Sequence, residues 1–168
     1  MVQEIESVIN KIQPHKNLAG KIAAISISKK RGIPKTNVQS ARLIENYGID
    51  GDAHAGNWHR QVSLLPLESI EKMRMAGLPK LRAGAFAENL TIEGITLNQL
   101  PVGAKIKVGN SILMEVTQIG KECHNKCAIF FKVGDCVMPR EGIFAKVING
   151  GELFVNDNVT VETANDSI

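Results

Sequence analysis

The spacing of apolar residues along the chain predicts many short strands. Residues 21–28, KIAAISIS, follow Gly20 and are rich in β-branched side chains, which predicts the first strand. Further strands are predicted around residues 41–46, in RQVSLLP at residues 60–66, and in a segment that ends near Ile92. Strand-like segments therefore recur throughout the first half of the chain.

The second half of the chain alternates short apolar runs with turn residues. KIKVG and SILMEVTQI flank Gly109 and Asn110, a pair typical of a hairpin turn. Residues 143–161, IFAKVINGGELFVNDNVTV, predict two or three more strands, interrupted at Gly150–Gly151 and at Asn156–Asp157. Many short strands and few helices favour a mainly β fold, a compact, partly closed β-barrel with a few decorating helices.

Helical spacing of apolar residues is confined to two segments. Residues 3–12, QEIESVINKI, predict a short amphipathic helix, and residues 67–77, LESIEKMRMAG, predict a second helix that Gly77 ends. Between the first two strands, Gly32 and Pro34 in KKRGIPK predict a loop.

Length and composition are those of one globular domain. The chain has 168 residues, of which 43% are hydrophobic and 22% are charged. We expect a single domain, with its core at about residues 21–161, an N-terminal helical extension at residues 1–17, and a frayed tail at residues 162–168. No apolar run approaches the about 18 residues that span a membrane, and the N-terminus lacks a secretory signal pattern. The expected location is the cytoplasm, away from membranes, where thiols are mostly reduced.

Charge and aromatic content narrow the classes of partner. The net charge is +3, only the KKR run concentrates it, and aromatic residues make up 4% of the chain. Few aromatic rings leave little for base stacking, so a nucleic-acid partner is not expected. A small anionic ligand suits this charge better than a long polyanion, with a solvated surface and no partner as the alternative.

Three cysteines form the first group with candidate chemistry. Cys123, His124 and Cys127 lie in KECHNKC, and Cys136 follows in GDCVMPREG. Three is an odd number, which disfavours a closed disulfide framework. A zinc site needs about four ligands, and no second cysteine pair supplies them. Packing of the thiols as small buried hydrophobes is a further alternative.

A reactive thiolate is the interpretation with a specific physical motive. Nearby cations stabilise a thiolate and lower its pKa, and Lys121, His124 and Lys126 lie within a few residues of Cys123 or Cys127. Such a thiolate could ligate molybdenum, or hold a persulfide and pass the sulfur on. The extra cysteines, Cys123 and Cys136, could supply a resolving thiol or a second metal ligand.

Two further groups of polar residues lie in glycine-containing loops. In GIDGDAHAGNWHRQVSLL, Asp52 and His54 could polarise a ligand or orient each other, and Arg60 could grip a phosphate or carboxylate. GAFAENL offers Glu88 and Asn89 for the polar edge of a heterocycle. The alternative for each loop is a turn with solvated charges. Together with the loop around Arg140, these segments would suit the mouth of a small barrel.

Four motifs in order carry a resemblance to a known family. GIDGDAHAG followed by WHRQVSLL, then GAFAENLTIEGI, VTQIGKECHNKC and MPREGIFAKVINGGEL together resemble the MOSC family, the domain at the C-terminus of molybdenum-cofactor sulfurases. The resemblance runs from about Lys21 to Val161 and is greatest to small stand-alone bacterial forms. It implies a β-barrel with a pocket for molybdopterin, and a cysteine that carries sulfur or ligates molybdenum. Cys127 fits that position best, with Cys123 as its rival.

The resemblance also implies the residues of the cofactor site. The expected cofactor-binding residues are Gly51, Asp52, His54, Arg60, Glu88, Asn89, Lys121, His124 and Arg140. Among them, Lys121 and Arg140 suit the anionic phosphate and dithiolene end of a pterin.

Three functions follow from the resemblance. The first is a sulfur-carrying or cofactor-assembly protein, which would receive sulfur from a cysteine desulfurase or another protein of cofactor synthesis. The pyridoxal-phosphate domain of the sulfurases does not fit within 168 residues, so the sulfur is expected from elsewhere. The second is a molybdoenzyme that reduces N-hydroxylated substrates. The third is a non-catalytic module that binds or stores the cofactor, so whether the protein is an enzyme stays open.

Overall fold

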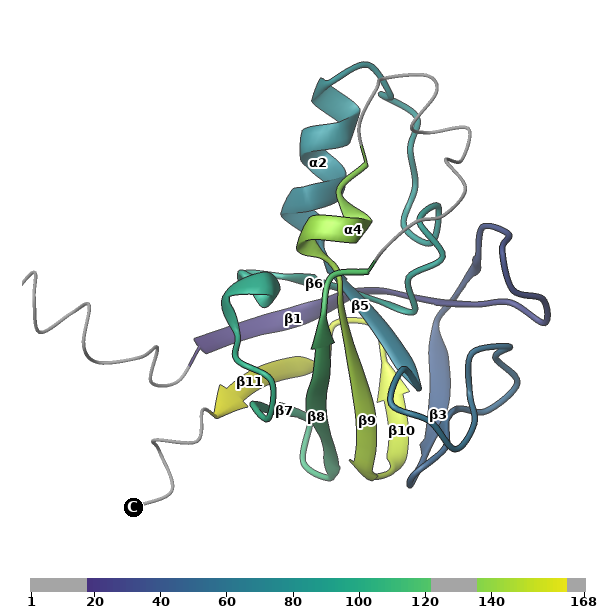
Figure 1. Cartoon of the computed structure of the whole chain (residues 1–168), viewed down its shortest axis with the longest axis vertical. Coiled ribbons are helices and arrows are strands. Elements are labelled where there is room, and N and C mark those ends of the chain that lie inside the picture. Colours follow the sequence, from purple (N-terminus) through teal and green to yellow (C-terminus); the bar gives the residue numbers. More distant parts are fainter. Residues whose placement is uncertain (1–17, 122–135, 163–168) are drawn as a thin grey trace, which may run out of the picture.

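A computed structural model of the chain describes residues 18–121 and 136–162 (Figure 1). Seven strands form the main body: β1 (Leu18–Ile27), β5 (Val62–Pro66), β6 (Leu90–Glu93), β7 (Lys105–Val108), β8 (Ile112–Ile119), β9 (Ile143–Asn149) and β11 (Asn158–Glu162). They follow one another in the order β1, β11, β7, β8, β9, β5, β6, and β6 pairs with β1 again. The strands therefore close into a barrel, as the pattern of short strands predicts.

The remaining elements decorate the barrel. β2 (Thr36–Val38) pairs with the end of β1, and a separate sheet contains β3 (Ser40–Ile44), β4 (Gly48–Ile49) and β10 (Gly151–Phe154). The helical elements are α2 (Leu67–Met75), α4 (Met138–Glu141) and the short 3₁₀ turn η1 (Leu97–Gln99). In Figure 1, α2 and α4 stand together beyond the ends of the central strands.

Alternation along the strands fills the interior of the barrel. In β8, Ile112, Met114 and Val116 are buried, whereas Glu115 between them is half-exposed and contacts Lys105 and Lys146 on the neighbouring strands. Side chains in a strand point alternately to its two faces, so an apolar residue at every second position lines the core. The β7–β8 hairpin around Gly109 has the predicted antiparallel register.

One pair of the described barrel strands is parallel, and α2 lies in the connection between its two strands. β5 and β6 run parallel, and parallel strands need a crossover, which α2 begins directly after Pro66. A second apolar cluster fills the space between α2, α4 and the barrel; it includes Leu65, Ile70, Met73, Phe86, Val137, Met138 and Phe144. Cys136 is half-buried and packs against this cluster.

Most of the predicted elements are present, with two additions. The strand expected around residues 41–46 is β3, and the helix expected at residues 67–77 ends at Met75. The sequence did not predict β2 and β4, which have only three and two residues, or the pairing of β10 with β3, which lie more than a hundred residues apart. The predicted helix at residues 3–12, the extension at residues 1–17 and most of the tail lie outside the described residues.

Within the described ranges, no helix is both long and apolar enough to cross a membrane.

Leu90→Ala should lower the free energy of unfolding by about 2–5 kcal/mol, because it leaves a cavity beneath a central strand. Leu90 is fully buried in the barrel core. Chemical denaturation measures the change. Met75→Ala is the matched control, because Met75 is 89% exposed and its truncation should cost no more than about 0.5 kcal/mol. Equal losses for the two variants would contradict this description of the core.

Candidate functional site

Two loops from different parts of the chain meet beside the barrel. Residues 28–35 follow β1, and residues 50–61 lead into β5. The backbone N–H of Ala53 donates to the carbonyl of Ser28 at 2.8 Å, and Arg31 Nε donates to the carbonyl of Ala53 at 3.3 Å. These bonds hold the polar residues of the second loop against the first loop.

A buried ion pair joins the two loops. The side chain of Lys35 is fully buried, and its Nζ lies 2.7 Å from Asp52 Oδ1 and 2.8 Å from His54 Nδ1. Asp52 also accepts the backbone N–H groups of Ser28 and His54, each at 3.1 Å. Because both charges are paired and hydrogen-bonded, they can remain inside the protein.

The surroundings lower the pKa of Asp52 and also that of His54. Burial alone would raise the pKa of Asp52, but the hydrogen bond and charge of Lys35, with the two backbone N–H groups, lower it below 3.8. Asp52 therefore stabilises the fold fully above its unfolded pKa, and this stabilisation is lost as pH falls through the lowered value.

His54 has its pKa lowered from 6.5 to about 4. Burial is the largest cause, followed by the charge of Lys35; Asp52 opposes the shift, while Arg31 and Lys121 add to it. Lys121, two residues after the end of β8, is thus one of the cations whose charge acts on His54.

The ring of Trp58 contacts two cations, Arg31 and Arg60. Trp58 Nε1 donates to the carbonyl of His54 at 2.7 Å, which fixes the ring beside the buried pair. The guanidinium carbons of Arg31 and Arg60 each lie 4.9 Å from the centroid of the Trp58 ring, and that of Arg60 lies 5.4 Å from the centroid of Phe144. Such cation–π contacts fix a guanidinium without neutralising its charge.

Arg60 has an unsatisfied donor. Its Nε is buried and has no hydrogen-bond partner among the described residues. A buried donor without an acceptor is costly, so an external acceptor at this position would relieve that cost. We define the cationic cluster as Arg31 and Arg60, which contact Trp58, together with Lys121, whose charge acts on His54.

α4 holds Lys121 in place. The backbone N–H of Lys121 donates to the carbonyl of Pro139 at 3.1 Å, and that of Gly120 donates to the carbonyl of Gly142 at 2.7 Å. A Cβ at Gly120 would lie 2.4 Å from the Pro139 oxygen, so only glycine permits this approach. Arg140, also a predicted site residue, is exposed on α4.

Glu88 and Asn89 are buried and bind the protein's own backbone. Glu88 accepts the backbone N–H groups of Gly84 and Phe86, and Asn89 bonds to Ser63 and to the carbonyl of Ser26. Burial raises the pKa of Glu88, against the opposing effect of the backbone N–H groups. A direct contact of either side chain with a ligand remains a prediction.

The other predicted residues are distributed as follows. Gly51 is exposed in the loop beside Asp52. Cys123, His124 and Cys127 lie outside the described residues, so their roles remain predictions. Among the residues that the structure describes, no three His, Cys, Asp or Glu side chains gather as metal ligands would.

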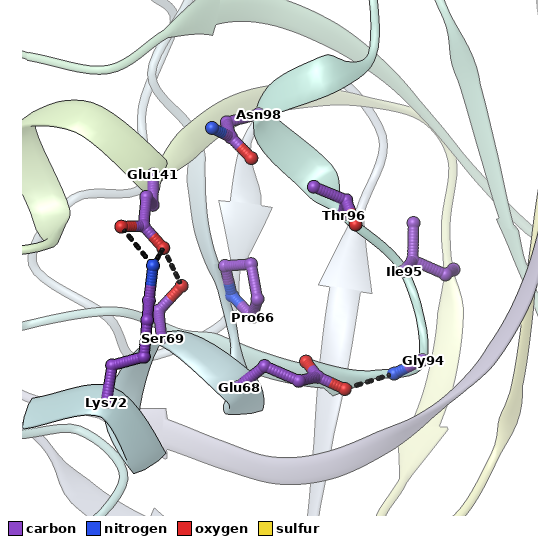
Figure 2. A pocket seen from close by; sticks show the side chains of 9 residues that line it. All are labelled: Pro66, Glu68, Ser69, Lys72, Gly94, Ile95, Thr96, Asn98 and Glu141. Atoms are coloured by element: carbon purple, nitrogen blue, oxygen red, sulfur yellow. Dashed lines mark hydrogen bonds and ion pairs between the residues drawn. The ribbon is translucent and has the colours of Figure 1, made fainter. Parts of the chain in front are cut away.

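A separate pocket of about 400 Å³ lies between the start of α2, the end of α4 and residues 94–98 (Figure 2). Glu141 in its wall accepts hydrogen bonds from Ser69 and Lys72, both at 2.7 Å, and Glu68 accepts the backbone N–H of Gly94 at 2.8 Å. Both carboxylates in the pocket wall are therefore already hydrogen-bonded. None of the predicted site residues lines this pocket.

Comparison with protein families decides the relationship. The family model described as "MOSC domain" matches residues 50–160. The chain belongs to the MOSC domain family. This family is associated with binding of the molybdenum cofactor. Among curated protein sequences, no significant match was found.

Solved structures share the fold of this MOSC domain. YuaD from Bacillus subtilis matches with a TM-score of 0.75 at 17% identity, over 88% of this chain and 98% of that protein. YiiM from Escherichia coli matches with a TM-score of 0.60 at 18% identity, over 85% and 70% of the two chains. YiiM from Geobacillus stearothermophilus gives 0.63 at 19% identity, over 85% and 75%.

Sequence reasoning missed three residues of the site. Lys35 and Arg31 lie before the matched segment of the MOSC domain, in a stretch that the sequence marks only as a loop. Nothing local distinguishes Lys35, because its burial depends on Asp52, 17 residues further on. Trp58 did carry a signal, since it is the single tryptophan of the chain and lies in a polar loop.

Lys35→Met should lower the free energy of unfolding by about 3–5 kcal/mol, because it leaves the Asp52 carboxylate buried without its partner. Chemical denaturation at pH 7 measures this loss. Adding Asp52→Asn should recover part of it, since the double variant no longer buries an uncompensated charge. Strictly additive losses in the two single variants and the double variant would contradict the coupling.

Proposed function

We propose that this MOSC domain binds the molybdenum cofactor through its cationic cluster and carries sulfur on Cys127, as a cytoplasmic sulfur carrier or cofactor-assembly protein. The observation that carries the proposal is Arg60, whose buried Nε has no hydrogen-bond partner in the described part of the chain. A guanidinium held by aromatic rings, with its donors unpaired, suits a phosphate or carboxylate of a ligand.

The surrounding residues fit an anionic cofactor. Arg31 and Lys121 add positive charge close to His54, and Asp52 is already paired with Lys35. An anion at this position would therefore meet cations and N–H donors and no free carboxylate of this group. We assign Lys121 and Arg140 to the phosphate end of the ligand, and His124 and Gly51 to the surrounding contacts.

We assign Glu88 and Asn89 a positioning role in this function. Glu88 holds the backbone of Gly84, whose carbonyl accepts the N–H of Lys35 at 2.9 Å. Asn89 holds Ser26 and Ser63, and Ser26 lies on β1 just before the first loop. Both side chains thus support the loop that carries Lys35.

The sulfur step needs a donor that already carries sulfane sulfur. The thiolate of Cys127 would attack the terminal sulfur of a persulfide on a cysteine desulfurase. One S–S bond forms on Cys127 while the donor's S–S bond breaks, and the donor cysteine leaves as a thiolate, so no net oxidation occurs. Lys121 is joined by chain to the segment of Cys123 and Cys127, and its charge would favour the thiolate. When bound, the cofactor would supply molybdenum and its dithiolene sulfurs beside this thiol.

Cys127→Ser should abolish persulfide formation when the protein is incubated with a cysteine desulfurase and cysteine, because serine cannot hold a sulfane sulfur. Mass spectrometry of the intact protein measures the added sulfur. Cys136→Ser is the matched control and should retain it, since Cys136 packs against the second apolar cluster. Loss in Cys123→Ser alone would transfer the role to Cys123.

Tightly bound molybdenum with turnover of a hydroxylamine, and no persulfide, would favour a reductase. Pterin binding without either activity would favour a storage module.

Arg60→Gln should weaken binding of the cofactor by about 10- to 100-fold, the equivalent of a lost charge-assisted hydrogen bond. Pterin and molybdenum analysis of protein purified from a host that makes the cofactor measures retention. Arg60→Lys should recover only part of it, because lysine keeps the charge but loses the planar fork. Arg42→Gln, at an exposed position of β3, is the control. Unchanged retention in Arg60→Gln would overturn the site.

A further inference from the structure

We infer that Lys35 fixes His54 as a neutral imidazole with its proton on Nε2, so that His54 offers an N–H donor and favours an oxyanion in its less protonated form. The first half of this inference rests on the geometry of the buried pair alone. The second half rests on the proposed function, which it deepens by naming the form of ligand that the site selects.

The distances assign the tautomer. An ammonium group has three donors and no acceptor, so the contact of 2.8 Å between Lys35 Nζ and His54 Nδ1 requires the imidazole nitrogen to accept. A neutral imidazole carries one proton, which must then lie on Nε2. An imidazolium would place two donors against each other at this distance.

Lys35 is held so that it cannot easily leave this position. Its side chain is fully buried, its Nζ pairs with Asp52 at 2.7 Å, and its backbone N–H bonds to Gly84 at 2.9 Å. Asp52 in turn accepts two backbone N–H groups. Groups from both loops and from the segment before β6 therefore hold Lys35 against His54.

Asp52 accepts the backbone N–H of His54, but no hydrogen bond joins its carboxylate directly to the His54 ring. Asp52 Oδ2 lies 3.8 Å from His54 Nδ1, which is too long for a hydrogen bond. The sequence suggested that Asp52 and His54 orient each other, whereas the structure inserts Lys35 between them. Lys35 is thus a positioning residue for His54, and Asp52 positions Lys35.

The charged groups that face His54 agree with a neutral ring. Burial lowers its pKa most, and the cations Lys35, Arg31 and Lys121 lower it further against Asp52, to about 4. The unfolded ring has a pKa of 6.5, so the unfolded chain binds more protons between these two values. Stability associated with His54 is therefore lost as pH falls from 6.5 towards 4, and at neutral pH the ring is uncharged.

The remaining nitrogen determines what the ring can recognise. His54 is 23% exposed, and its Nε2 has no hydrogen-bond partner among the described residues. With Arg60 and Lys121, it would surround a ligand with donors only. Because His54 has no spare lone pair, it cannot accept a hydrogen bond from a protonated phosphate oxygen, and the site favours the form of the oxyanion that carries fewer protons.

Nitrogen-15 NMR of the whole chain tests the tautomer directly. The chain has four histidines, so the loss of one ring spectrum in His54→Asn assigns His54. We expect Nδ1 without a proton and Nε2 with one, and this pattern should persist from pH 8 to about 5. A proton on Nδ1, an equal mixture of tautomers, or titration near pH 6.5 would overturn the inference.

Lys35→Met with Asp52→Asn tests whether Lys35 is the cause. The double variant removes both buried charges together, which avoids leaving one of them unpaired. We expect mixed tautomers and a His54 pKa that moves from about 4 towards 6.5. The wild-type tautomer and pKa retained in this folded variant would show that Lys35 does not position His54.

Inorganic phosphate separates this inference from the proposed function. In the wild type, phosphate added at pH 8 should shift the Nε2–H signal, and binding should weaken at least tenfold between pH 8 and pH 5.5 as the dianion disappears. Phosphate that shifts the signal equally well at both values would overturn the preference for the ionised form. A correct tautomer with no response to phosphate would support the role of Lys35 and overturn the anion site.

Discussion

The buried pair of Lys35 and Asp52 is the interaction on which the site depends. It joins two loops, residues 28–35 and 50–61, that no strand pairing connects directly at this point. A lysine excluded from water is tolerated only with its charge compensated, so the position of Asp52 dictates that of Lys35. The same contact brings His54 within reach of the amine, at 2.8 Å. The loops therefore have one arrangement that satisfies the buried charges.

The barrel supplies the rigid frame for this arrangement. β1 leads into the first loop and β5 follows the second, and both strands belong to the closed ring. The parallel crossover through α2 creates the second apolar cluster, on which α4 sits. α4 then holds the backbone of Gly120 and Lys121. The apolar packing of α4 thus helps to position Lys121. Rigid surroundings of this kind keep ligand-binding groups in place.

The sequence predicted what depends on local pattern and missed what depends on distant pairing. The β7–β8 hairpin follows from alternation around Gly109–Asn110, and the glycine-rich loop revealed Asp52, His54 and Arg60 as a group. By contrast, β10 pairs with β3, more than a hundred residues away, and no local signal reports such a partner. Glu88 was predicted as a ligand contact because an acid beside an amide in GAFAENL could bind the polar edge of a heterocycle, and because of the family resemblance. Its burial against backbone N–H groups is visible only when the chain is folded.

Burial lowers the pKa of His54 most, and the cations around the ring lower it further and would also attract the anion that we propose. Asp52 compensates Lys35, so the charges left uncompensated nearby are those of Arg31 and Lys121, with Arg60 beyond Trp58. The positive potential of these cations adds to the cost of protonating His54 and would favour a bound anion. The two effects are linked: an anion bound beside His54 offsets the cations and raises the pKa of the ring. Protonation would in turn require Nδ1 to lose its contact with Lys35. The contact with Lys35 would thus oppose protonation of the ring even when the proposed anion raises its pKa.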